Sequence, residues 1–232
     1  MMIDLHGFEN LLLQGTIVTV KLTFTALALG LVLGLLGATA KLSDTFIFRW
    51  MGNSYSTLVR GLPEFLVVLS FYFGASHVLM MIASKFGYDE YIEVSGFVAG
   101  FVALGFIFGA YASELFRGAI IAIPKGQAEA ARALGMSEFQ TFFRITLPQV
   151  WRIALPGLGN LFMILMKDTA LVSVVGLEEL LRVTAFAVGR TKEPFTFYLA
   201  AAVIYLVLTS VASFGLRHLE KRASTGVREL AS

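Results

Sequence analysis

Long apolar runs separated by short polar stretches dominate the pattern of this 232-residue chain. A helix needs roughly 20 mostly apolar residues to cross a bilayer core of about 30 Å. The runs that meet this requirement cover residues 11–40, 64–83, 96–116, 153–177 and 195–216. The pattern therefore predicts an all-α membrane protein, with five transmembrane helices in a single domain over residues 1–232.

Composition agrees with this pattern and excludes several classes of protein. Hydrophobic residues make up 57% of the chain and charged residues 15%, whereas soluble domains carry about 25% charged residues. The net charge of +2 is too small to indicate a nucleic-acid partner. Cysteine is absent and the three histidines are scattered, so we expect no disulfide and no metal site.

Glycine pairs four residues apart recur within the predicted spans. Such pairs let helix backbones approach closely where no hydrophobic force drives helices together. Glycine is also simply common in membrane helices, so a single pair would mean little. The three pairs together predict a tightly packed bundle: Gly30 with Gly34, Gly96 with Gly100, and Gly105 with Gly109.

The positive charges of the connecting segments predict the orientation of the chain. Lysine and arginine concentrate in cytoplasmic loops, so the side with more of them is expected to lie inside. One side holds Lys41, Arg49, Arg60, Arg117, Lys125, Arg132, Arg144, Arg152, Arg217, Lys221, Arg222 and Arg228. The other side holds Lys85, Arg182, Arg190 and Lys192. We therefore predict that the N-terminus lies outside and the C-terminus inside.

A polar segment, residues 117–152, separates the third and fourth spans on the predicted cytoplasmic side. Its stretch "GQAEAARAL" is rich in strong helix formers and stops at Gly135, a residue type that often ends helices. Ser137 then opens the capping-box pattern "SEFQ". We predict two short helices joined by a tight corner, the second ending at Leu147–Pro148.

The first of these helices presents small side chains and one carboxylate, Glu129. An amphipathic helix lying on lipid is the alternative, but such helices usually carry bulky apolar anchors. Alanines favour insertion into a groove on another protein.

The spacing within this segment resembles the "EAA" signature of ABC importer permeases. Glu129-Ala130-Ala131, then Gly135, Ile145 and Leu147-Pro148 match the signature at each position. The likeness extends over most of the chain and is greatest to permeases for arginine and for histidine, lysine, arginine and ornithine. Further matching stretches are "TLVRGLPEFLVVL", "ALPGLGNLF", "LMKDTALVSVVGLEEL" and "EPFTFY".

This resemblance implies a type I ABC importer permease in the bacterial inner membrane. The segment with Glu129, Ala130, Ala131 and Gly135 would be the coupling helix, which sits in a cleft of a cytoplasmic ATPase. The chain itself would be no enzyme and hold no cofactor, since ATP and Mg²⁺ belong to two copies of that ATPase. The expected partners also include a homologous permease in a heterodimer, an extracytoplasmic amino-acid-binding protein and membrane lipid.

Polar side chains within the fourth span are candidates for substrate contact, because polar groups in a membrane often mark pathways. Asp168 could serve the substrate or make a structural ion pair, as could its neighbour Lys167. Thr169 and Ser173 would share one face of an α-helix. Their hydroxyls could bind an amino acid or merely bond to backbone carbonyls.

A cationic substrate needs a carboxylate partner, and a guanidinium prefers a bidentate one. The resemblance implies contact around Asp168 and Glu178, and Glu178 is the first choice, ahead of Glu179. Glu64 is the other candidate, unless it simply pairs with Arg60. Its predicted place near the cytoplasmic end suits an exit path better than a binding pocket. Further along the chain, Glu114 is expected to pair with Arg117.

Alternative functions remain open from the sequence. The substrate could be another polar amino acid such as glutamine. A stand-alone secondary carrier would commonly show internal repeats and more spans. An intramembrane enzyme would need a nucleophile–base or metal set, which the sequence lacks.

Overall fold

A computed structural model describes residues 5–88 and 94–223, so Arg228 of the charge count lies outside the described part. Within these two ranges the chain forms helices and no strand. The α-helices are α1 (Glu9–Lys41), α2 (Phe46–Gly61), α3 (Glu64–Ser84), α4 (Gly96–Ala122), α5 (Lys125–Ala133), α6 (Glu138–Thr141), α7 (Leu147–Asp168), α8 (Leu180–Thr191) and α9 (Pro194–Ala223). A π-helical turn, Phe142–Thr146, precedes α7, and a 3-10 helix, Thr169–Val175, follows it.

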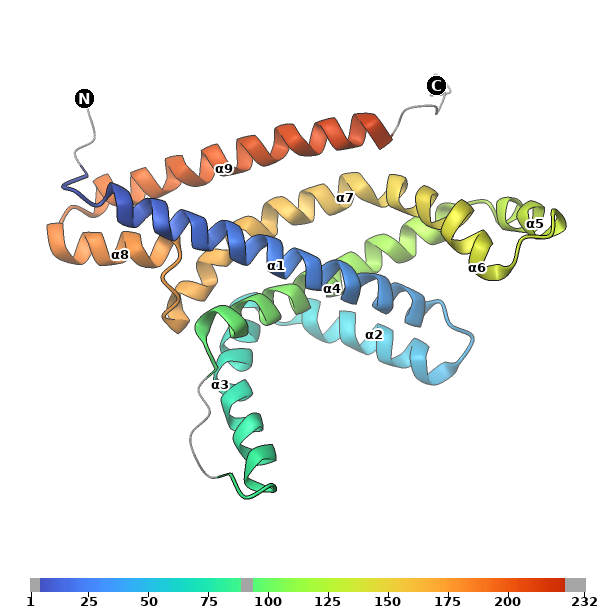
Figure 1. Cartoon of the computed structure of the whole chain (residues 1–232), viewed down its shortest axis with the longest axis horizontal. Helices are drawn as coiled ribbons and strands as arrows, with labels where there is room; N and C mark the ends of the chain where they lie inside the picture. The colour runs from blue at the N-terminus through green and yellow to red at the C-terminus, as the bar shows by residue number, and fades with distance from the viewer. Residues whose placement is uncertain (1–4, 89–93, 224–232) are drawn as a thin grey trace.

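The prediction of five helices able to cross a membrane is confirmed for the described residues. They are α1, α3, α4, the continuous stretch Glu138–Val175, and α9. Of these, α1, α4, α7 and α9 run along the length of the molecule, whereas α3 points away from them (Figure 1). Only 17% of the apolar window of α3 is buried, against 61% for α4. α4 is therefore the centre of the bundle, and α3 is an arm with little cover from its own chain.

Glycines bring the backbones of α1 and α4 close together, as the glycine pairs predict. A Cβ at Gly30 would lie 2.6 Å from Cδ1 of Phe108 and 3.0 Å from the carbonyl oxygen of Gly105. A Cβ at Gly105 would in turn lie 3.0 Å from the carbonyl oxygen of Ala26. Because the glycines have no side chain, the two helix backbones contact each other directly at these positions. Dispersion contacts therefore extend over the long face that the two helices share.

Sequence reasoning missed α2, which lies beside the second half of α1 (Figure 1). Its apolar run is too short and too often interrupted to be identified as a span. Gly52 and Ser56 are buried, and a Cβ at Gly52 would lie 3.1 Å from the carbonyl oxygen of Gly37. The spacing of these two residues repeats the small-xxx-small pattern of the spans, and this signal was available in the sequence.

The helix–corner–helix expected after α4 is present. α5 ends where Gly135 adopts a left-handed backbone with φ +84°, and the amide of Met136 donates to the carbonyl of Ala131 over 3.1 Å. The capping box is confirmed. The Gln140 amide donates to Ser137 Oγ at 3.2 Å, and the Ser137 amide donates to Gln140 Oε1 at 3.0 Å.

The prediction that Leu147–Pro148 end the second helix is wrong. The chain stays helical from Glu138 to Val175, with Pro148 in the first turn of α7. The π-helical turn before it has wider hydrogen-bond spacing. Because that turn interrupts the regular ladder of hydrogen bonds, it accommodates Pro148, which has no N–H to donate. The α5–α6 corner is thus joined to α7 by continuous helix.

The two ends of the molecule carry different features. The α5–α6 corner projects at the end where α1 finishes, and α8 lies at the opposite end beside the first turns of α1 (Figure 1). α8 was not predicted either. It packs through Leu180, Val183 and Ala187 in a small separate core with Leu12 and Phe197.

Candidate functional site

Two candidate carboxylates from different helices meet in one pocket. Glu64 at the start of α3 and Asp168 at the end of α7 both line a cavity of about 130 Å³. Their carboxyl groups interact with each other, and the Tyr111 side chain from α4 interacts with Glu64. The remaining lining residues are apolar: Leu104, Ile107, Phe108, Leu161, Ile164 and Leu165. The lining of the pocket is therefore mostly apolar, apart from two carboxylates and one tyrosine.

Asp168 does not make the structural ion pair that was the alternative for it. No ion pair of Asp168 occurs in the described part of the chain, and Lys167 is exposed. Its side chain interacts with another carboxylate, Glu64, and also with the charge of Lys167. Two carboxylates facing one another repel unless a proton or a cation lies between them.

Thr169 and Ser173 do not share a helix face, so that expectation is wrong. They lie in a 3-10 helix, where residues three apart eclipse and residues four apart diverge. The buried hydroxyl of Thr169 donates to the backbone carbonyl of Met166 over 2.8 Å, which is the backbone alternative. Ser173 is half-buried, and neither residue lines the acidic pocket.

Glu178 and Glu179 have opposite environments. Glu178, the first choice for the cationic ligand, is exposed and is not among the residues that line the Glu64–Asp168 pocket. Glu179 is fully buried and caps α8. Its carboxylate accepts from the amides of Arg182 at 2.7 Å and Leu181 at 2.9 Å, and from the Tyr205 hydroxyl at 3.3 Å. Burial raises the pKa of Glu179, and these donors oppose the rise.

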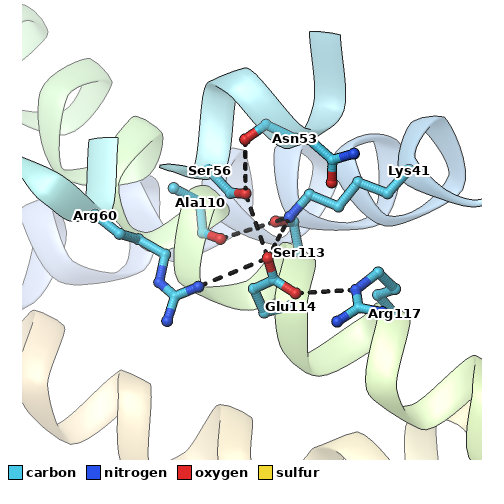
Figure 2. Close-up of polar contacts among 8 residues, drawn as sticks. All are labelled: Lys41, Asn53, Ser56, Arg60, Ala110, Ser113, Glu114 and Arg117. Carbon is cyan, nitrogen blue, oxygen red and sulfur yellow. Dashed lines mark hydrogen bonds and ion pairs between the residues drawn. The ribbon is translucent and has the colours of Figure 1, made fainter. Parts of the chain in front are cut away.

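A second charged cluster gathers around Glu114 in α4 (Figure 2). One of its oxygens accepts from Nζ of Lys41 at 2.9 Å, and the other from Nε of Arg117 at 3.0 Å. Ser56 donates to the same carboxylate at 3.3 Å, and Nη1 of Arg60 lies 3.6 Å away. The cluster therefore joins α1, α2 and α4 through one carboxylate and three cations.

This cluster decides two sequence predictions. The pairing of Glu114 with Arg117 is confirmed. The alternative pairing of Arg60 with Glu64 is wrong, since Arg60 pairs with Glu114 instead. α2 ends at Gly61 and α3 begins after Pro63, so the helical spacing of four residues does not apply. The sequence did not indicate that Lys41 joins this cluster from a distant part of the chain.

Most residues of the EAA stretch lie on the surface of the α5–α6 corner. Glu129, Ala130 and Gly135 are exposed, while Ala131 is buried. An ion pair of 2.9 Å between Arg132 and Glu138 connects α5 to α6. The corner is held by its own cap and ion pair, and its outer face is open.

Comparison with known proteins identifies the family. Residues 26–225 match the family described as "Binding-protein-dependent transport system inner membrane component". The histidine/lysine/arginine/ornithine transport permease HisQ of Salmonella typhimurium is 43% identical, over 97% of this chain and 98% of that protein. The nopaline transport permease NocQ of Agrobacterium fabrum is 44% identical, over 96% of this chain and 94% of that protein. The arginine ABC transporter permease ArtQ of Escherichia coli is 42% identical, over 89% and 92%.

Comparison with solved structures gives the same family. A chain from the crystal structure of an amino acid ABC transporter with histidines aligns with a TM-score of 0.79 and 34% identity, covering 96% of this chain and all of that one. A chain of the inward-facing MetNI methionine ABC transporter shares the fold, with a TM-score of 0.74 at 19% identity. Neither the secondary-carrier nor the enzyme alternative has support among these relatives. This chain belongs to the binding-protein-dependent inner membrane components and is a permease of ABC importers for polar amino acids.

Proposed function

We propose that this permease subunit imports a basic L-amino acid, arginine or a related cation, through the pocket lined by Glu64 and Asp168. The observation that carries the proposal is the meeting of these two carboxylates in a mostly apolar pocket. The relatives named above for histidine, lysine, arginine and ornithine transport support the same class of substrate.

Electrostatics favours a cation over a neutral substrate in this pocket. Carboxylates facing one another away from water repel, and a guanidinium or ammonium between them relieves the repulsion. A guanidinium can also donate to both groups in the bidentate geometry that carboxylates accept. The apolar lining from α4 and α7 suits the methylene chain of such a substrate. Glutamine carries no positive charge that could relieve this repulsion.

Coupling to ATP hydrolysis is proposed to pass through the exposed face of α5. Glu129 and Ala130 would enter a cleft on a separate cytoplasmic ATPase, which binds ATP and Mg²⁺ in two copies. Because α6 continues through the π-helical turn into α7, a movement of the corner is transmitted to the helix that carries Asp168. This arrangement requires the N-terminus outside and the α5–α6 corner inside.

A homologous permease in a heterodimer and an extracytoplasmic binding protein complete the proposed importer. The weakly covered arm α3 supports a second permease, since apolar side chains of this arm need cover from lipid or protein. Thr169 and Ser173, the other substrate contacts proposed from the sequence, lie outside the pocket lining, so we expect them to contribute less than Glu64 and Asp168. Glu178, the first choice from the sequence, is exposed and outside the pocket, so we expect it to make no required substrate contact.

Substrate choice is tested by ATP-driven uptake of arginine, lysine, histidine and glutamine into proteoliposomes that contain the complete importer. We expect wild type to prefer the cations. Glu64→Gln and Asp168→Asn should each reduce arginine uptake at least tenfold, with glutamine uptake little changed. Glu178→Gln, the matched control at an exposed carboxylate, should keep arginine uptake. Loss of arginine transport in Glu178→Gln alone would place the ligand there and overturn the pocket assignment.

Coupling is tested in the same vesicles. Glu129→Ala should abolish uptake and the ATPase stimulation caused by the loaded binding protein, while arginine still binds to the detergent-purified complex. Glu138→Ala removes only a solvent-exposed ion pair with Arg132, which contributes little to the corner, so it should keep most of the stimulated ATPase activity. Normal uptake by Glu129→Ala would refute a coupling role for this face.

A further inference from the structure

The guanidinium of Arg60 contacts Glu114 and also a residue of the acidic pocket, Tyr111. Its Cζ is 5.4 Å from the centre of the Tyr111 ring, and its Nη1 is 3.6 Å from Oε1 of Glu114. The same tyrosine lines the acidic pocket and interacts with Glu64. The Tyr111 ring therefore lies between Arg60 and the Glu64–Asp168 pocket in this chain of contacts, while Arg60 contacts Glu114 directly.

Glu114 holds Arg60 less firmly than its other cations. Lys41, with 1% of its side chain exposed, and Arg117 both donate hydrogen bonds to it, at 2.9 Å and 3.0 Å. At 3.6 Å the contact with Arg60 is an ion pair beyond hydrogen-bond distance, and 43% of the Arg60 side chain is exposed. Because two other cations remain, Glu114 stays paired if Arg60 moves away.

Around Glu114 the cations outnumber the carboxylates, whereas in the acidic pocket the carboxylates outnumber the cations. Glu64 and Asp168 line it, and no lysine or arginine is among its lining residues. Arg60 stands at the last turn of α2, directly before the bend at Pro63 that starts α3. Rotation of its long side chain across the Tyr111 face would carry the guanidinium towards Glu64, with a cation–π contact along the way.

We propose that Arg60 is a tethered competitor of the substrate, whose guanidinium exchanges between Glu114 and the Glu64–Asp168 pair. In the structure it occupies the Glu114 position. A cationic amino acid entering the pocket keeps it there, and its return towards Glu64 displaces the substrate. This inference rests on the proposed function, because only a cationic substrate competes with a guanidinium for two carboxylates.

Such a competitor answers a difficulty of transport. Two carboxylates in an apolar pocket hold a cation strongly, and a transporter must also release it. An internal guanidinium that takes the place of the departing substrate spares the pocket an uncompensated charge. The apparent affinity for substrate is then reduced by the fraction of time that Arg60 occupies the pocket. Arg60 is a positioning residue for release rather than a permanent ligand.

The test is equilibrium binding of radiolabelled L-arginine to the complete importer complex in nanodiscs, without binding protein. Arg60→Gln should lower the dissociation constant for arginine about three- to tenfold, and change that for glutamine less than twofold. Arg60→Lys keeps a competing cation and should restore the wild-type value. Arg117→Gln, which also removes a partner of Glu114, is the matched control and should bind arginine as wild type does.

The outcomes separate this inference from the proposed function. Unchanged or weaker arginine binding in Arg60→Gln, with the complex folded by its melting temperature, would show that Arg60 only supports the Glu114 cluster. An equal change in Arg60→Gln and Arg117→Gln would overturn the inference in the same way. If Glu64→Gln leaves arginine binding unaltered in the wild-type background, the proposed function fails, and the competitor role falls with it.

Discussion

Lys41 in the last turn of α1 reaches Glu114 in α4 across 2.9 Å, with almost no exposure of the lysine side chain. Removal of one partner from a buried pair leaves an uncompensated charge, which costs about 3–5 kcal/mol. Glu114→Gln should therefore destabilise the protein strongly, because Lys41 would be left without a carboxylate.

The matched variant is Arg117→Gln. That side chain is 41% exposed, so its loss should cost no more than about 1 kcal/mol. Thermal unfolding in detergent compares the two variants. Equal melting temperatures would mean that Glu114 is not the centre of a buried cluster.

The close approach of α1 and α4 predicts a contrast between Gly30, which lies in their interface, and Gly118, which lies on an exposed part of α4. Gly30→Ala would place a methyl group 2.6 Å from the Phe108 ring and 3.0 Å from the backbone of Gly105, and such overpacking costs about 1–3 kcal/mol. Gly118→Ala lies on α4 where nothing is within 4 Å, so it should be neutral or slightly stabilising. Melting temperatures of both variants, measured side by side, check this, and a stable Gly30→Ala protein would contradict the packing.

Hydrophobic length and local helix signals predicted the spans, the α5–α6 corner and the capping box at Ser137, because each depends on residues close in sequence. The sequence could not show that Glu64 and Asp168 meet, since their pairing depends on how α3 leaves α2 and how α7 ends. Glu179 was ranked below Glu178 because burial is a tertiary property. Glu179 is the N-cap of α8, but this role could not be recognised from the sequence because α8 itself was not predicted.

Burial of Glu179 predicts a dependence of stability on pH. Its folded-state pKa is raised above the ordinary value of 4.5, mainly by burial. The folded protein then binds more protons than the unfolded chain, so stability is lost as pH rises from about 4.5 through the folded pKa. Glu179→Gln keeps an oxygen for the cap and has no proton to lose, so its melting temperature should fall less over this range.

Glu178→Gln is the control for this pH series. It changes the neighbouring carboxyl, which is exposed, and its profile should follow that of wild type. Parallel profiles for wild type and Glu179→Gln between pH 4.5 and 7 would contradict a raised pKa at Glu179.

The corner between α5 and α6 depends on the left-handed backbone of Gly135, at φ +84°. An L-residue there costs about 1–2 kcal/mol, so Gly135→Ala should loosen the turn that holds the Met136 amide against Ala131. Hydrogen exchange of residues 131–136 should accelerate at least about fivefold. Gly126→Ala, in the first turns of α5 with nothing within 4 Å, should slow exchange instead, since alanine favours helix. A rigid corner is needed to move α7, so Gly135→Ala should also lower the stimulated ATPase activity, whereas Gly126→Ala should not. Faster exchange in Gly135→Ala with full ATPase stimulation would show that coupling does not depend on the rigidity of the corner.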